Sequence, residues 1–233
     1  MHTNVSPLIS SRRPTPLWVR AGFWICTAIA VAVVIRRIFA LAAPPRSSSA
    51  PPQLAALDNF FASQAALTLA HIIPALAFVL VAPFIVFRRT AWAERLIFPL
   101  GAIVGITAYA MSGHAVGGWI ERSAVLFFNT LFLYSLLRSW LYKARQDAAQ
   151  ERTWLLRSIA VLLGIATTRP VMGVFFATSR LTHLTPQQFF GIAFWIGFSI
   201  NTLAFEFWIR SRARQSQPET RPQFAPDAAG KTL

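Results

Sequence analysis

Six long apolar stretches dominate the pattern of hydrophobic and polar positions along the chain. A membrane-spanning helix needs roughly 20 mostly apolar residues, because in lipid every backbone polar group must be satisfied within the segment. The stretches that meet or approach this length cover residues 21–43, 60–87, 96–120, 123–141, 158–179 and 189–209. The pattern therefore predicts an all-α fold, a polytopic membrane helix bundle with six transmembrane helices.

The stretches differ in how completely they exclude charge. The second and third contain no Asp, Glu, Lys or Arg. The first carries Arg36 and Arg37 close enough to its end for both side chains to snorkel to the interface. The fifth carries Arg169 at its middle, followed by Pro170, which predicts a kink and a buried cation.

The basic residues are unevenly divided between the two sides of the predicted bundle. Six spans place both termini on the same side. Of the 22 Lys and Arg residues, 16 lie on that side and five on the other. Because Lys and Arg are enriched in cytoplasmic loops, this asymmetry predicts that both termini are cytoplasmic. The expected location is a bacterial inner membrane.

Polar segments frame the predicted membrane domain, residues 17–212. Residues 1–16 are predicted to form a cytoplasmic tail, and the polar residues 213–233 a disordered one. A Pro- and Ser-rich linker at 44–52 is expected to be extended. Residues 138–157 are expected to contain a short amphipathic helix, anchored by Trp and Tyr side chains and attracted to anionic lipid headgroups.

The first apolar stretch also permits a second interpretation, a cleavable signal peptide. Basic residues precede it, and the small residues at 40–42 would form the cleavage site. Arg36 and Arg37 stand just before that site and would have to be translocated, which argues against cleavage.

Composition supports the membrane interpretation and excludes other classes. The chain is 55% hydrophobic and 13% charged, whereas soluble domains are about 25% charged. The formal charge of +14 would suit nucleic acid, but the basic residues cluster at the ends of apolar runs, so no nucleic-acid partner is expected. A single cysteine, Cys26, excludes an intrachain disulfide and a Cys-based metal cluster.

Four polar side chains lie within the predicted spans and are candidates for a site: His71, Asn129, Arg169 and Asn201. An Arg at the bilayer centre costs about 2.5–3.5 kcal/mol on insertion scales, so such groups should converge on the bundle interior. A small polar cavity that binds a small anion or holds water is therefore expected. Substitution of His71 and Arg169 should be the most damaging.

The alternative for Arg169 is a structural role, in which it locks helices together. Its candidate partners are Asn129, Asn201 and the carbonyls freed at the expected kink. Glu206 is expected to pair with Arg210 four residues later.

Two histidines give a second candidate function, electron transfer by a b-type haem. His71 and His114 are predicted to lie at one depth on neighbouring helices, an arrangement that supplies both axial ligands of a haem iron. The alternative is that His71 bonds across helices while His114 is interfacial. No other cofactor and no metal site are expected. Because catalytic motifs such as Gly-x-Ser-x-Gly and His-Glu-x-x-His are absent, no catalytic residue is assigned and an enzyme is not favoured.

The segment 145–158, followed by 166–169, resembles a bacterial family of predicted multi-pass membrane proteins, domain of unknown function 2306. The family pattern, Arg-x-Asp-x-x-x-His-Arg-Arg-Trp-Met-x-Arg-Ser entering a span, is similar to the chain at Asp147, Arg152, Trp154, Arg157, Ser158 and Arg169. His71 followed by Ala82-Pro83-Phe84 is also similar, and the likeness covers residues 66–212.

The chain departs from this family pattern at two positions. Glu94 and Glu151 stand where the family has histidines. The resemblance implies the multi-pass topology and carries no activity.

Overall fold

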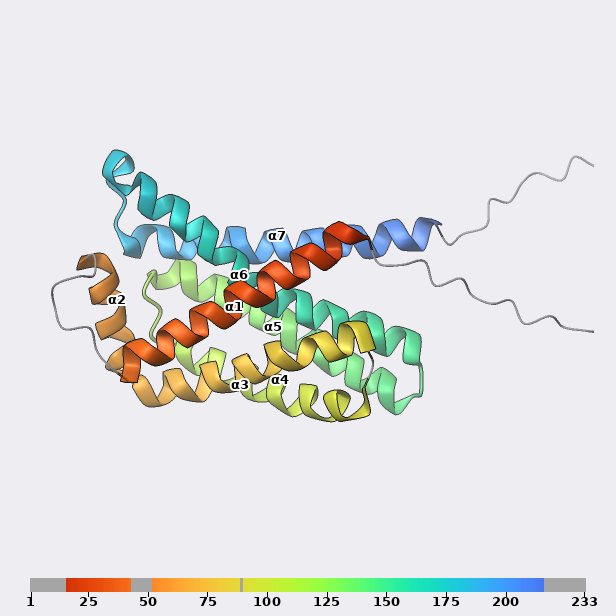
Figure 1. The fold of residues 1–233 in the computed structure, drawn as a ribbon. Coiled ribbons are helices and arrows are strands. Elements are labelled where there is room, and N and C mark those ends of the chain that lie inside the picture. The colour runs from red at the N-terminus through yellow and green to blue at the C-terminus, as the bar shows by residue number, and fades with distance from the viewer. Residues whose placement is uncertain (1–15, 43–51, 89, 216–233) are drawn as a thin grey trace, which may run out of the picture.

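The computed structural model describes residues 16–42, 52–88 and 90–215. Every regular element within them is helical, which confirms the all-α fold (Figure 1). The elements are α1 Leu17–Ala42, α2 Pro52–Ala62, α3 Ala65–Pro83, the π-helical turn η1 Phe84–Arg88, α4 Ala91–Ser112, α5 Gly118–Ala144, α6 Ala148–Thr182 and α7 Pro186–Gln215.

Six helices among the described residues are long and apolar enough to cross a membrane, as the sequence predicts. They are α1, α3 continued by η1, α4, α5, and most of α6 and α7. Large apolar side chains such as Ile106, Leu203 and Phe207 remain exposed on the bundle surface, which suits contact with lipid. The chain is therefore an integral, multi-pass membrane protein.

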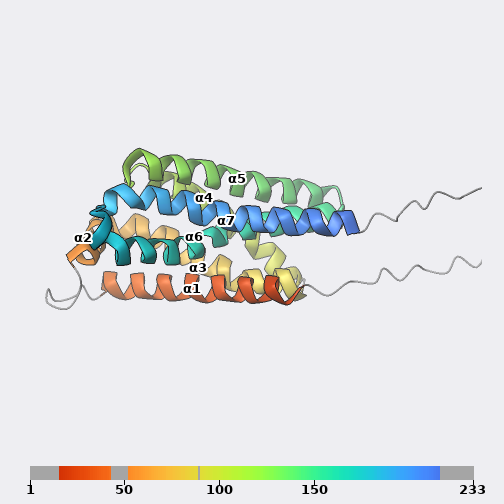
Figure 2. The ribbon, with the colours of Figure 1, turned by 90° about the horizontal axis from the view of Figure 1, so that it is seen from above.

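The helices form one bundle with two distinct ends (Figures 1 and 2). At the α2 end, helices α1, α4 and α6 finish and α3, α5 and α7 begin, with the short α2 lying beside them. At the opposite tail end, α1 begins and α7 finishes. The start of α1 and the end of α7 thus lie at the same end of the bundle, and the side on which the two termini lie stays a prediction.

Glycines bring α6 close to α7. A Cβ atom on Gly197 would lie 2.6 Å from the Cα of Thr168, and one on Gly164 would lie 2.5 Å from the ring of Phe198. Small residues at such crossings let two backbones approach closely in a membrane, where packing replaces the hydrophobic effect as the driving force. The α6–α7 pair is accordingly among the most extensive contacts of the bundle.

The third predicted span, residues 96–120, needs correction. Helix α4 ends at Ser112, residues 113–117 form a turn, and α5 begins at Gly118 with a φ of +60°. Hydropathy continues without a break through this region, whereas the closely spaced glycines interrupt the helix because they favour irregular backbone. His114 therefore lies in a turn and not on a transmembrane helix.

The predicted linker and second span also differ from the structure. The span expected at 60–87 is divided into α2 and α3 by a turn at Ser63 and Gln64, and α3 passes into η1 after Pro83. Pro52 opens α2, a position where its missing N–H costs nothing. The rest of the predicted linker, and most of both predicted tails, lie outside the described residues, although α7 continues to Gln215.

The expected amphipathic helix at residues 138–157 is wrong. Helix α5 continues to Ala144 and α6 begins at Ala148, so the expected anchors Trp140, Tyr142 and Trp154 belong to these two long helices. The turn between them covers only residues 145–147. The Asp147 side chain caps α6, accepting a hydrogen bond from the Gln150 amide at 3.1 Å.

Candidate functional site

A cavity of about 240 Å³ lies inside the bundle toward the α2 end. All six spanning helices line it, together with α2 and the turn after α4. Its polar lining consists of Arg37, Thr68, His71, Ser112, His114, Glu121, Asn129 and Arg169. Three of the four predicted intramembrane residues thus share one cavity, whereas Asn201 is not among its lining residues.

Arg169 lines the cavity with hydrogen-bonding capacity that the described residues leave unused. Its Nε is buried and has no hydrogen-bond partner among the described residues, and its Nη1 reaches only the sulfur of Met172, at 3.9 Å. The charges of Glu121, Arg37 and Arg36 are close enough to act on it. A guanidinium with unused donors inside a bundle is prepared to bind an anionic acceptor.

The predicted partners of Arg169 are engaged elsewhere. Asn129 donates its Nδ2 to the backbone oxygen of Gly105 at 2.9 Å, which ties α5 to α4. Asn201 donates to the backbone oxygen of Ala160 at 3.4 Å and accepts from Thr167 at 2.9 Å, which ties α7 to α6. Both asparagines therefore act as links between helices, and neither is an amide partner for the arginine.

His71 is held in a defined orientation by Thr107 on α4, with 2.9 Å between its Nδ1 and the threonine Oγ1. The threonine hydroxyl also lies 2.7 Å from the backbone oxygen of Ile103 and 3.1 Å from that of Val104. When it donates its single proton to one of these oxygens, it accepts from the Nδ1–H tautomer of the histidine, and the lone pair on Nε2 is then free for another partner.

Glu121 is a site residue that the sequence reasoning missed. It stands in the first turn of α5, is only 8% exposed, and accepts a hydrogen bond from the Gly117 amide at 2.6 Å. The predicted spans place Glu121 in a short loop, because the apolar character of the third stretch continues to residue 120. The glycines at 113, 117 and 118 are the signal that places the helix start earlier and Glu121 inside it.

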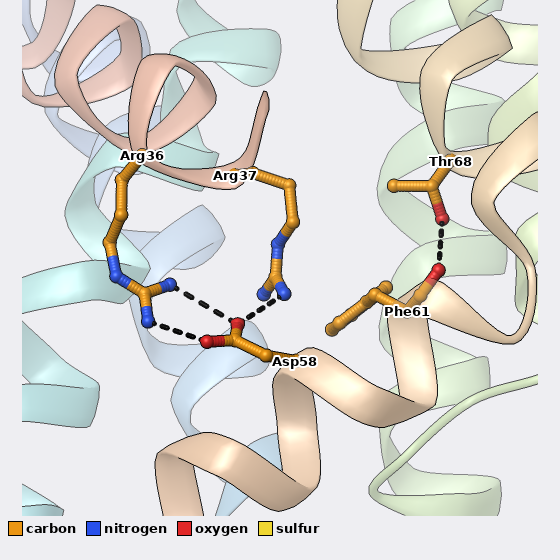
Figure 3. A network of polar contacts seen from close by, with 5 residues as sticks. All are labelled: Arg36, Arg37, Asp58, Phe61 and Thr68. Carbon is orange, nitrogen blue, oxygen red and sulfur yellow. Dashed lines mark hydrogen bonds and ion pairs between the residues drawn. The ribbon is translucent and has the colours of Figure 1, made fainter. Parts of the chain in front are cut away.

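A second missed feature is an ion-pair cluster between α1 and α2, drawn in Figure 3. Asp58 lies 2.9 Å from an Nη of Arg36 and 2.6 Å from an Nη of Arg37, and it is 7% exposed. The Arg37 guanidinium also lies 4.2 Å from the ring centre of Phe61, a cation–π contact. The expectation that both arginines snorkel is therefore corrected for Arg37, which is only 15% exposed.

The end of α2 is tied to α3 as well. Thr68 donates its hydroxyl to the backbone oxygen of Phe61 at 3.4 Å (Figure 3). Because Arg37, Phe61 and Thr68 all line the cavity, α2 and its ion pairs form part of the wall at the α2 end.

The charges grouped around Asp58 and Arg169 do not balance. In their ordinary charged forms, Arg36, Arg37 and Arg169 supply three positive charges, and Asp58 and Glu121 supply two negative ones. One positive charge is thus in excess within this group. In a low-dielectric interior such an excess favours an additional anion.

Apart from Arg169, the residues that resemble the family pattern lie elsewhere, toward the tail end. Arg157 forms a two-point ion pair with Glu206 of α7, and Arg210 is 3.9 Å from the same carboxylate, so the expected pair with Arg210 is the weaker of the two. Trp154 lies beneath both Arg157 and Arg138, with guanidinium-to-ring distances of 4.5 and 5.1 Å.

Other motif positions also make local contacts. Ser158 donates to the backbone oxygen of Leu155 at 2.8 Å, and Arg152 donates to that of Val86 at 3.0 Å. Glu94 and Glu151, the two departures, flank Lys143 at 3.0 and 3.7 Å. Among these positions Arg169 alone lines the cavity. Arg152, Trp154 and Arg157 join α6 to η1, α5 and α7, whereas Asp147 and Ser158 bond to α6 itself.

His114 lines the cavity from the turn after α4 and is exposed. Within the described ranges no group of three or more His, Cys, Asp or Glu side chains is placed to hold a metal ion. Comparison of the chain with protein-family models, with curated proteins and with solved structures found no match.

Proposed function

We propose that the protein binds a small anion inside the membrane, in the cavity at the α2 end. The observation that carries this proposal is Arg169, whose buried Nε lacks a partner among the described residues while its guanidinium borders the cavity. The excess positive charge of the surrounding group supports it, since an anion would compensate that charge.

The size of the cavity limits the ligand. A volume of about 240 Å³ is smaller than the roughly 300–1,000 Å³ of pockets for drug-sized molecules. The occupant is accordingly a small solute, and the protein handles it as a carrier, channel or receptor of the membrane.

The location follows from the basic residues. We propose a bacterial inner membrane with both termini cytoplasmic, which places the cavity in the periplasmic half of the bilayer. At the tail end, Arg138 and Arg157 beside Trp154 provide a basic and aromatic band that suits anionic lipid headgroups. The resemblance to domain of unknown function 2306 stays a prediction.

Replacing Arg169 with Gln is expected to weaken anion binding by about tenfold or more, because it removes a charge-assisted donor. Binding is measured as the rise in unfolding temperature of detergent-purified protein with increasing nitrate, at constant ionic strength made up with gluconate. Arg210→Gln is the matched control, since Arg210 is 78% exposed on the same bundle at the tail end. Equal nitrate responses of the two variants would refute the proposal.

Haem binding is the second candidate function, and one observation favours it: His71 and His114 line the same cavity. In the tautomer that donates Nδ1–H to Thr107, the Nε2 lone pair of His71 is available, which is the arrangement of a ligating histidine. The small volume and the exposed turn that carries His114 favour the anion instead.

The visible spectrum of protein expressed with ample haem separates these two candidates. If the anion proposal holds, the purified protein has no b-type absorption band in its reduced-minus-oxidised spectrum. A sharp band that disappears in His71→Ala but persists in His183→Asn, a change in the turn after α6, would establish haem binding in its place.

A further inference from the structure

We infer that the anion bound in this cavity is a monocarboxylate with a small apolar body. This inference rests on the proposed function and names its ligand class. It is carried by the way polar and apolar groups are distributed along the cavity, from the α2 end toward the middle of the bundle.

The charged groups gather toward the α2 end. Counted along the helices at 1.5 Å per residue, Glu121 lies about 5 Å from the start of α5 and Arg37 about 8 Å from the end of α1. The backbone of Arg169 lies deeper in the bundle than those of Glu121 and Arg37, but its guanidinium is directed toward the α2 end. It lies against Met172, almost one turn further along α6, and within reach of the charges of Glu121 and Arg37.

The deeper part of the cavity is apolar. Val79 and Phe132 lie about 21 Å from the starts of α3 and α5, and Phe198 lies about 18 Å from the start of α7. Phe128 stacks on Phe198 with 5.1 Å between ring centres. These side chains offer dispersion contacts and no hydrogen bonds to an occupant.

Asn129 is a polar side chain in this deeper part, but its amide is already used to link α5 to α4. Asn129 lines the cavity about 16 Å from the start of α5, but its Nδ2 already donates to the backbone oxygen of Gly105. A small inorganic ion would make no contact with the deeper apolar side chains. A polar organic anion would lose its hydrogen bonds to water on entering that part of the cavity. An anionic head with an apolar body fits both parts.

The guanidinium groups and the charge of the site together point to a carboxylate head. The planar fork of Arg matches the paired oxygens of a carboxylate or a phosphate, which Lys would not do, and a carboxylate carries a single negative charge. Arg37 is already held in place by Asp58 and by the ring of Phe61, so its orientation costs little on binding. The single excess positive charge of the group corresponds to one negative charge on the ligand.

The test compares probes of matched shape on detergent-purified protein, by the rise in unfolding temperature. Benzoate and butyrate are expected to bind about tenfold or more tightly than nitrate, because their carbon atoms leave water. Benzamide, which has the shape of benzoate without its charge, is expected to produce no shift, as is gluconate, whose body is polar. Equal binding of benzamide and benzoate would overturn the inference.

A pair of variants separates the apolar part from the anion site. Ala75 lines the cavity about 15 Å from the start of α3, so Ala75→Leu fills that part and should weaken benzoate about tenfold while preserving the nitrate response. Ala70→Leu, at an exposed position of the same helix, should change neither. The placement of the ligand body is wrong if Ala75→Leu, but not Ala70→Leu, loses both the benzoate and the nitrate response. It is also wrong if Ala75→Leu loses neither response.

The results of these tests separate the carboxylate inference from the proposed anion-binding function. If nitrate binds and benzoate binds no more tightly, the carboxylate inference is wrong and the anion proposal stands. If no anion binds, both are wrong. If dodecanoate binds more tightly than butyrate, the ligand is a membrane fatty acid and the small body is wrong.

Discussion

Replacing Asp58 with Asn is expected to lower the free energy of unfolding by about 3 kcal/mol or more, since breaking a buried ion pair typically costs about 3–5 kcal/mol. The change leaves the guanidiniums of Arg36 and Arg37 without the carboxylate that they share. The low end of the range applies because Arg36 is 49% exposed and its pair is screened by solvent. Equilibrium unfolding of the purified protein in mixed detergent measures the loss.

Glu94→Gln is the matched control for Asp58→Asn. Its pair with Lys143 has side-chain exposures of 24% and 38%, so its loss should cost about 1 kcal/mol or less. Within the Asp58 cluster, Arg37→Gln should destabilise more than Arg36→Gln, because Arg37 is the more buried and also stacks on Phe61. Similar losses in Asp58→Asn and Glu94→Gln would show that the cluster contributes no more than a surface pair.

Replacing Gly197 with Ala is expected to cost about 1–3 kcal/mol, the range for overpacking a tight interior. The added Cβ would lie 2.6 Å from backbone atoms of Thr168, and a helix backbone cannot rotate away as a side chain does. Helices α6 and α7 must separate instead, which displaces the adjoining Arg169. We therefore expect a lower unfolding temperature together with a weaker nitrate response.

Gly173→Ala is the matched control on α6. A Cβ at Gly173 would meet nothing within 4 Å, so this change removes backbone freedom without a clash. Stability should stay the same or rise, and nitrate binding should be unchanged. A loss in Gly173→Ala equal to that in Gly197→Ala would mean that the α6–α7 crossing is not the cause.

Part of the site was predictable from local sequence. His71, Asn129 and Arg169 are polar residues inside long apolar stretches, and the cost of exposing them to lipid requires an inward position. Asn201 also lies inside an apolar stretch, but it bonds to α6 and does not line the cavity. The cost of exposure to lipid requires a polar group to face protein, but it does not select which neighbour the group contacts.

Glu121, His114 and Asp58 were misplaced or missed for a related reason. Hydropathy extends evenly from residue 96 to residue 120, so it cannot show where α4 turns into α5. Asp58 lies 21 residues after Arg37 in the chain, across a Pro- and Ser-rich segment, and no local pattern joins them. Their pairing depends on α2 folding back beside the end of α1.

The sequence by itself determined that the chain is all-helical and has six segments able to span a membrane, since these depend on the length and charge of segments that each satisfy their own backbone in lipid. The tertiary structure alone decided the cavity. Which side chains border it depends on how far each helix is rotated and where glycines let neighbours approach. Its charged and polar lining comes from α1, α3, α4, α5, α6 and the turn after α4, from positions up to more than 100 residues apart. Contacts of this kind are set by packing between helices, which the hydropathy of each helix does not encode.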